Sequence, residues 1–227
     1  MLKIKFQATL LILMLLSLYS CGGDPPPPLN NIKASLKNVK DCSVILEDMN
    51  VKGNIFKDYF HKYRIIQGED SRTTDLFKVS KNAFNQYQPY LNMTIWSKKD
   101  GIVSDAIEPP GYNYVGNRNY GEWRTNSSGQ SFWAFYGQYR LFSDLVGGPV
   151  YRRDYDSYRT YRTRNKYKPY YGSKKQYGTS GSFTKKQKPN FYKRKVAKSK
   201  SSFASKVSKR IGRTKTSSRG RSRKSGK

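Results

Sequence analysis

The chain has 227 residues, with 44 Lys and Arg against 15 Asp and Glu, and a formal net charge of +29. A chain of this length holds one or two domains. Its two Cys and one His exclude a zinc site with four Cys/His ligands from one chain, and any reaction that needs two histidines.

The first 20 residues have the pattern of a secretory signal. Lys3 and Lys5 precede an apolar run over residues 6–18, which is shorter than the roughly 20 apolar residues of a membrane span. The run ends in Leu18-Tyr19-Ser20-Cys21. This tetrapeptide resembles the lipobox of bacterial lipoproteins, in which an apolar, a tolerated and a small residue precede an invariant Cys.

The lipobox resemblance implies cleavage before Cys21 and attachment of membrane lipid to that residue. It places the protein in the cell envelope. Gly22 stands where some lipoproteins carry the Asp that retains them at an inner membrane, which favours an outer membrane. The alternatives are a plain signal peptide followed by a chance Cys, or a buried N-terminal helix.

Residues 21–40 are expected to be a tether. Four consecutive prolines, Pro25 to Pro28, favour an extended polyproline segment of about 3.1 Å per residue. Such a spacer would hold a folded domain away from the lipid surface.

Residues 41–148 are expected to form a small globular α+β domain. The patterns predict paired strands at residues 42–49 and 55–67, a helix over 74–87, a hairpin with strands 92–97 and 101–104 around Asp100-Gly101, and a helix over 131–146. The predicted fold is a small antiparallel sheet with one or two helices and an aromatic-rich end.

The aromatic-rich end is residues 111–142, which hold ten Phe, Tyr and Trp and five Gly. This pattern is similar to a family of uncharacterised bacterial envelope proteins, and the resemblance implies no activity. One interpretation makes these rings the core of the domain. The other makes them a platform for sugar rings or a polymer, with five candidate residues: Trp96, Trp123, Trp133, Arg118 and Arg124.

Catalytic chemistry is not indicated. Cys42 and His61 fall on the two predicted paired strands, but no third group that could orient them is apparent. The neighbouring acids Glu47 and Asp48 diverge on a strand, so they do not form a paired-carboxylate site. We expect a non-enzymatic protein without a cofactor or metal.

Residues 149–227 are expected to be a long disordered basic tail. The stretch 151–227 holds 27 of the 44 Lys and Arg, only two acidic residues, and no Leu or Trp, which leaves little apolar area to bury. Such a tail attracts polyanions in a salt-dependent way. Its candidate contacts are Arg152, Arg153, Arg162, Arg164, Arg219, Arg221 and Arg223.

One part of this tail predicts a short basic amphipathic helix. Phe203, Val207 and Ile211 are spaced by four among lysines and arginines, so on a helix they would lie together and could rest on an anionic membrane. The sequence thus favours a lipid-anchored envelope protein whose tail binds envelope polymers or lipids. The alternatives are non-specific nucleic-acid binding through the interleaved Tyr and Arg, and a solvated tail with no specific partner.

Overall fold

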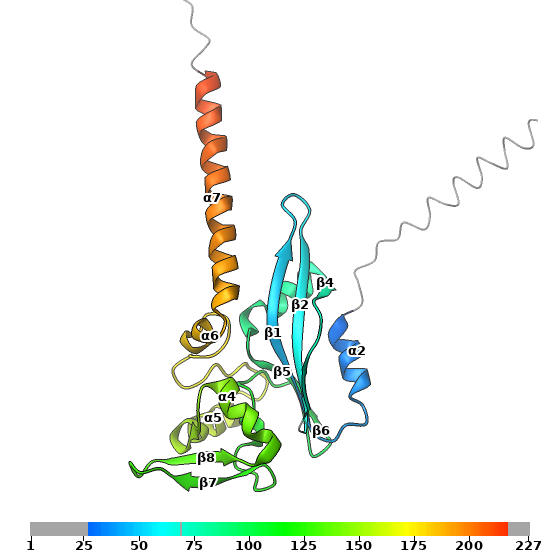
Figure 1. Ribbon diagram of the computed structural model, residues 1–227, viewed down its shortest axis with the longest axis vertical. Helices are drawn as coiled ribbons and strands as arrows, with labels where there is room; N and C mark the ends of the chain where they lie inside the picture. Colours follow the sequence, from blue (N-terminus) through cyan, green and yellow to red (C-terminus); the bar gives the residue numbers. More distant parts are fainter. Residues whose placement is uncertain (1–26, 69, 218–227) are drawn as a thin grey trace, which may run out of the picture.

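The computed structural model describes residues 27–68 and 70–217, without the side chains of Gln138 and residues 211–217. The predicted signal and Cys21 lie outside this range. Figure 1 shows two antiparallel sheets surrounded by helices, and one long helix, α7 (Pro189–Ser217), that extends away from the rest. The predicted α+β class with antiparallel sheets is confirmed.

The first sheet has the strand order β3-β2-β1-β5-β6, and β4 also pairs with β2. Its strands are β1 (Cys42–Lys52), β2 (Asp58–Gln67), β3 (Asp70–Thr73), β4 (Phe77–Val79), β5 (Thr94–Lys99) and β6 (Ile102–Ser104). The expected pairing of the first two strands is confirmed. So is the hairpin at Asp100-Gly101, where both residues have the positive φ of a tight hairpin turn, 53° and 79°.

A helix that the sequence reading missed, α2 (Pro28–Ser35), covers one face of this sheet. The prediction of a tether over residues 21–40 is therefore wrong from Pro28 onward. Proline is tolerated in the first turn of a helix, because its missing N–H would have no partner there. The spacing of Leu29, Ile32 and Leu36, all buried, is the helical signal beyond the prolines.

β1 is buried on both faces over its first half. Val44 and Leu46 pack in the cluster that includes α2, whereas Ile45 packs among the aromatic rings on the other side. Side chains alternate along a strand, so this one strand joins the two halves of the core.

The second sheet has the order β7-β8-β9, formed by Gly121–Thr125, Ser131–Phe135 and Val150–Tyr151. The predicted helix over 131–146 is wrong in its first half, because Ser131–Phe135 pairs as a strand with Trp133 opposite Trp123. The helix α4 spans Leu141–Val146 and ends at Gly147 in the left-handed region, φ 84°, where glycine carries no steric cost.

The predicted helix over 74–87 is also only partly present. Residues 77–79 form β4, and α3 (Lys81–Tyr87) starts after Ser80, whose hydroxyl accepts a hydrogen bond from the Ala83 N–H at 3.1 Å. Short 3-10 helices lie at Gln88–Tyr90, Tyr112–Tyr114 and Gly137–Arg140.

The chain beyond Gly148 is folded, so the prediction of disorder from residue 149 is wrong over most of the described part. It forms β9, α5 (Arg152–Arg164), α6 (Ser182–Gln187) and α7. Tyr158, Tyr170 and Tyr177 are buried in the aromatic core, and the Tyr170 N–H donates to the carbonyl of Ile107 at 2.9 Å. The rings of these tyrosines supply buried apolar area in a part of the chain, residues 151–227, that has no Leu or Trp.

Candidate functional site

The aromatic segment is a core and not an open platform. Trp133 and Trp96 are 1% and 4% exposed, so neither offers a face to a ligand. Trp123 is half-buried, in edge contact with Trp133 at 5.2 Å between ring centroids. Of the two candidate arginines, Arg118 is exposed and Arg124 pairs with Glu122 at 2.6 Å. The structure therefore does not bring the five platform candidates together.

A charged cluster lies inside the aromatic core, and the sequence reading missed it. The carboxylate of Glu108 is 1% exposed, and its Oε2 accepts hydrogen bonds from Tyr158 Oη at 2.6 Å and Arg162 Nη2 at 2.9 Å. Arg162 also donates to the carbonyl of Ile107 at 2.8 Å. Arg162 is thus half-buried with its guanidinium bonded to the protein, unlike the exposed arginine that the predicted polyanion contact requires.

Burial raises the pKa of the Glu108 carboxyl, against the opposing effects of the Arg162 charge and the Tyr158 hydroxyl. Glu108 Oε1 and Arg162 Nε are buried without a hydrogen-bond partner among the described residues. This ion pair joins α5 to the segment before Pro109.

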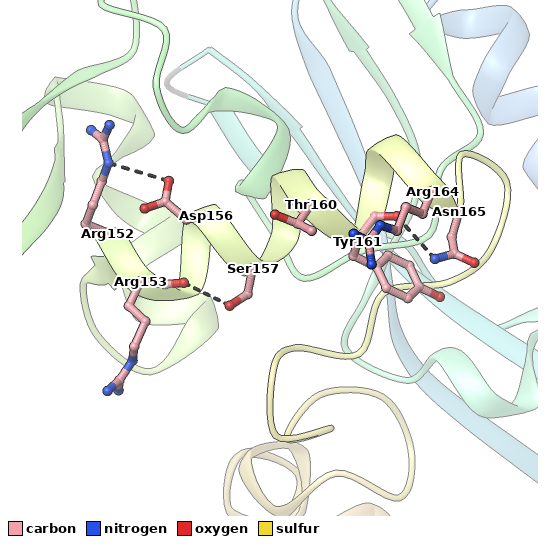
Figure 2. A pocket seen from close by; sticks show the side chains of 8 residues that line it. All are labelled: Arg152, Arg153, Asp156, Ser157, Thr160, Tyr161, Arg164 and Asn165. Carbon is pink, nitrogen blue, oxygen red and sulfur yellow. Dashed lines mark hydrogen bonds and ion pairs between the residues drawn. The ribbon is translucent and has the colours of Figure 1, made fainter.

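The outer face of α5 carries the exposed cations of this region, as Figure 2 shows. Arg153 and Arg164 are exposed near its two ends, and an open hollow of about 840 Å³ lies along the helix between them. Arg152 is exposed as well, but its guanidinium lies 4.6 Å from the ring centre of Trp123 and 3.6 Å from the Asp156 carboxylate. The hollow is shallow, and its lining residues all come from this helix and from Asn165, which directly follows it.

α7 is the most cationic element of the described chain. Its 29 residues hold ten Lys and Arg and no Asp or Glu, and at 1.5 Å per residue it is about 44 Å long. From Lys193 to Arg210 every side chain is exposed. The helix predicted around Phe203 and Val207 is confirmed as part of this longer element.

The base of α7 is fixed to β1 by ion pairs. Arg194 Nη2 lies 2.7 Å from both carboxylate oxygens of Asp48, and Lys188, just before the helix, pairs with Glu47. Although burial acts to raise it, the pKa of Glu47 is lowered by its hydrogen bonds from Arg64 and Lys188. The acidic side chains of β1 thus hold the start of the helix.

The opposite side of α7 carries an apolar stripe formed by Val196, Phe203 and Val207, which are 51%, 70% and 37% exposed. Spacings of seven and four place these residues on one face of a helix. Lys198, which donates to the carbonyl of Val51 on β1 at 2.9 Å, is two residues after Val196 and therefore points about 200° away from it. The stripe faces away from the fold, beside a hollow of about 360 Å³ lined by Phe203, Val207 and three basic residues.

Several predicted site residues lie where their side chains are not described. The backbone of Ile211 belongs to α7, but its side chain is not described. The structure describes no part of Arg219, Arg221 and Arg223. Cys21 also lies outside the described residues.

The two residues considered for a thiol–imidazole pair are far apart. Cys42 pairs with Gln67 at one end of the β1–β2 ladder, and His61 pairs with Met49 toward the other. Both are buried; burial raises the pKa of Cys42 and lowers that of His61 to about 4. Among the described residues, no three His, Cys, Asp or Glu side chains gather as metal ligands would.

In the described ranges no helix combines the length and the apolar character that crossing a bilayer requires. Comparison with protein-family models, curated proteins and solved structures returned no match. Both resemblances noted in the sequence therefore rest on the residues themselves.

Proposed function

We propose that this chain is a non-enzymatic cell-envelope lipoprotein, anchored by lipid on Cys21, whose basic carboxyl-terminal helix binds the anionic surface of a membrane or an envelope polyanion. The observation that carries the proposal is the surface of α7. It combines ten cations, no acidic residue and an exposed apolar stripe. A helix of this composition suits the interface of an anionic bilayer, where apolar side chains enter the headgroup region and lysines stay among the phosphates.

The lipid and the helix act together as two attachments. Acyl chains hold a protein at a membrane through about 0.8 kcal/mol for each buried methylene. Once the chain is held there, binding of α7 becomes an intramolecular event with a raised effective concentration. The outer membrane is the favoured location, because Gly22 follows the Cys.

Under the nucleic-acid alternative, the tyrosines among the arginines of residues 151–167 would stack on bases, but most of these rings are not exposed. Tyr158 is buried and Tyr155 and Tyr161 are half-buried against the core, so of these rings only Tyr167, at 89% exposed, is open for stacking. What is left is charge alone, which binds any polyanion. Such binding to nucleic acid is non-specific.

The test compares two kinds of change on α7, measured on the mature chain with Cys21→Ser so that acyl chains do not hide the result. Phe203→Ser with Val207→Ser removes two of the three apolar side chains of the stripe and keeps the charge. Its matched control, Lys206→Gln with Lys209→Gln, removes charge and keeps the stripe.

The stripe change is expected to weaken binding to phosphatidylglycerol vesicles by about tenfold, from loss of partly buried apolar area, and to leave DNA binding unchanged. The charge change lowers both affinities at moderate salt, by about 1 kcal/mol for each lysine near the surface. Circular dichroism checks that the helix persists. A stripe change without effect on vesicles, together with loss of single-stranded DNA binding on Tyr167→Ser, would move the nucleic-acid alternative ahead.

A further inference from the structure

The tip of the β1–β2 hairpin exposes two large apolar side chains. Ile55 and Phe56 are 88% and 89% exposed, more than any other Ile, Leu, Val or Phe among the described side chains. They lie in the loop that connects Lys52, the last residue of β1, to Asp58, its partner at the start of β2. Exposure of this kind costs solubility, and in soluble domains it marks contact with another surface.

The loop holds these side chains outward by its backbone. Gly53 has φ 83°, and a Cβ at that position would lie 1.9 Å from the carbonyl oxygen of Phe56. Glycine therefore allows the chain to turn back tightly on itself. Residues 52–58 are all exposed, and no core cluster of the described chain includes Ile55 or Phe56.

The charge around the tip is basic. Lys52 and Lys57 flank the apolar pair, and the only acidic residue of the loop ends, Asp58, pairs with Lys78 at 2.7 Å. Lys52 Nζ lies 5.0 Å from the ring centre of Phe60. Apolar side chains between lysines match the apolar and anionic layers of a phospholipid surface.

Helix α2, the first described element after the proposed anchor in the sequence, begins on the side of its length that faces the hairpin tip. Lys98 Nζ donates to the carbonyls of Leu36, Lys37 and Val39 after α2, and Lys98 pairs with Cys42 at the start of β1. α2 therefore ends where β1 begins and runs antiparallel to it, so that Pro28 lies toward the hairpin tip (Figure 1).

The basic helix lies beside the same tip. Lys198 of α7 donates to the carbonyl of Val51, which is two residues before Gly53. In Figure 1 the hairpin tip and the free end of α7 point the same way along the long axis. The hairpin tip and the apolar stripe thus lie toward one end of the protein, and α2 begins on the side of its length that faces this end.

We infer that Ile55 and Phe56 insert into the headgroup region of an anionic phospholipid bilayer and form a second contact that orients the protein at the membrane. This inference rests on the proposed function, because the lipid on Cys21 and the α7 stripe bring the tip to the surface. It adds a site on the folded domain itself, distinct from the basic carboxyl-terminal region.

The test places an environment-sensitive fluorophore at the tip through Phe56→Cys, in the chain with Cys21→Ser, which removes both the acyl anchor and the second native thiol. The matched control is Ile102→Cys, because Ile102 is also an exposed apolar residue of a hairpin, 74% exposed, and lies at the Cys42 end of the sheet. Cys42 is 2% exposed and does not compete for the label. The chain is added to phosphatidylglycerol vesicles with and without a lipid-borne quencher, and sedimentation reports binding separately.

The expected result is a blue shift and strong quenching of the label at position 56, and neither change at position 102. If the chain sediments with vesicles while both labels remain in water, the inference is overturned and the proposed function stands. If the chain does not sediment with vesicles, the inference is overturned together with membrane binding by α7, and of the proposed contacts of α7 only an envelope polyanion is left. A blue shift at position 56 without vesicles that grows with protein concentration shows that a second copy covers the tip, and it also overturns the inference.

Discussion

Replacing Arg162 by Met should destabilise the fold strongly, because the change leaves the carboxylate of Glu108 buried without its cation. Glu108 is 1% exposed, and Arg162 Nη2 lies 2.9 Å from its Oε2. Removing one partner of a buried ion pair typically costs about 3–5 kcal/mol. The matched control is Arg164→Met, two residues on in α5 and exposed, which should change stability by less than about 0.5 kcal/mol.

The assay is urea unfolding of both variants and the wild type at pH 7 and pH 5. Burial raises the pKa of Glu108 in the folded state, and loss of Arg162 raises it further. A folded state that raises the pKa of a carboxyl gains stability as the pH falls toward the pKa of that carboxyl in the unfolded chain. The loss of unfolding free energy in Arg162→Met, relative to the wild type, should therefore be smaller at pH 5 than at pH 7. Adding Glu108→Gln should recover part of the loss. Equal stability of the Arg162 and Arg164 variants would refute the buried pair and the packing of α5 on the core.

Three further outcomes follow from the packing. A chain ending at Gly148 should fail to melt cooperatively in calorimetry, since it lacks the tyrosines that complete the aromatic core; a sharp transition would contradict that packing. Gly147→Ala should cost more stability than Gly129→Ala in the same unfolding assay, because both have positive φ but only the Cβ at 147 would meet the Phe183 ring, at 2.0 Å. Burial lowers the pKa of His61 to about 4, so the free energy of unfolding should fall by roughly 3 kcal/mol as the pH decreases from about 6.5 to 4. His61→Phe should lack this loss, and parallel pH profiles of the two proteins would refute the assignment to His61.

The sequence predicts the local features with strong chemical signatures. The apolar run in residues 42–49, the loose alternation in residues 55–67 and the Asp100-Gly101 turn predict the centre of the first sheet and its hairpin. Gly147 marks the end of α4 for the same reason, a backbone conformation that favours glycine.

The parts that depend on distant partners are not predictable in the same way. Glu108 and Arg162 are 54 residues apart, and each alone has the pattern of a surface residue. Tyr158, Tyr170 and Tyr177 are buried, but a tyrosine in a basic segment carries no sequence signal that distinguishes a buried ring from an exposed one. Their burial depends on the core that the rest of the chain supplies. Net charge therefore led to a wrong prediction of disorder, since all the arginines of α5 except Arg162 are exposed, whereas Tyr158 is buried and Tyr155 and Tyr161 are half-buried.

One of the two candidate membrane contacts can be predicted from the sequence, and the other cannot. The spacing of Phe203 and Val207 already predicts an amphipathic helix, because period and charge are properties of the segment itself. Ile55 and Phe56 instead match the alternation of the second strand, and only the turn imposed by Gly53 places them outside the ladder.

The lipoprotein proposal is tested most directly by the intact mass of the protein isolated from membranes of the cells that make it. Cleavage before Cys21 and acylation of that residue predict a chain that begins at Cys21 with the added mass of its acyl groups. Cys21→Ser should release the protein or leave an uncleaved precursor. A soluble wild-type protein that begins at Met1 and carries no lipid would contradict the proposal.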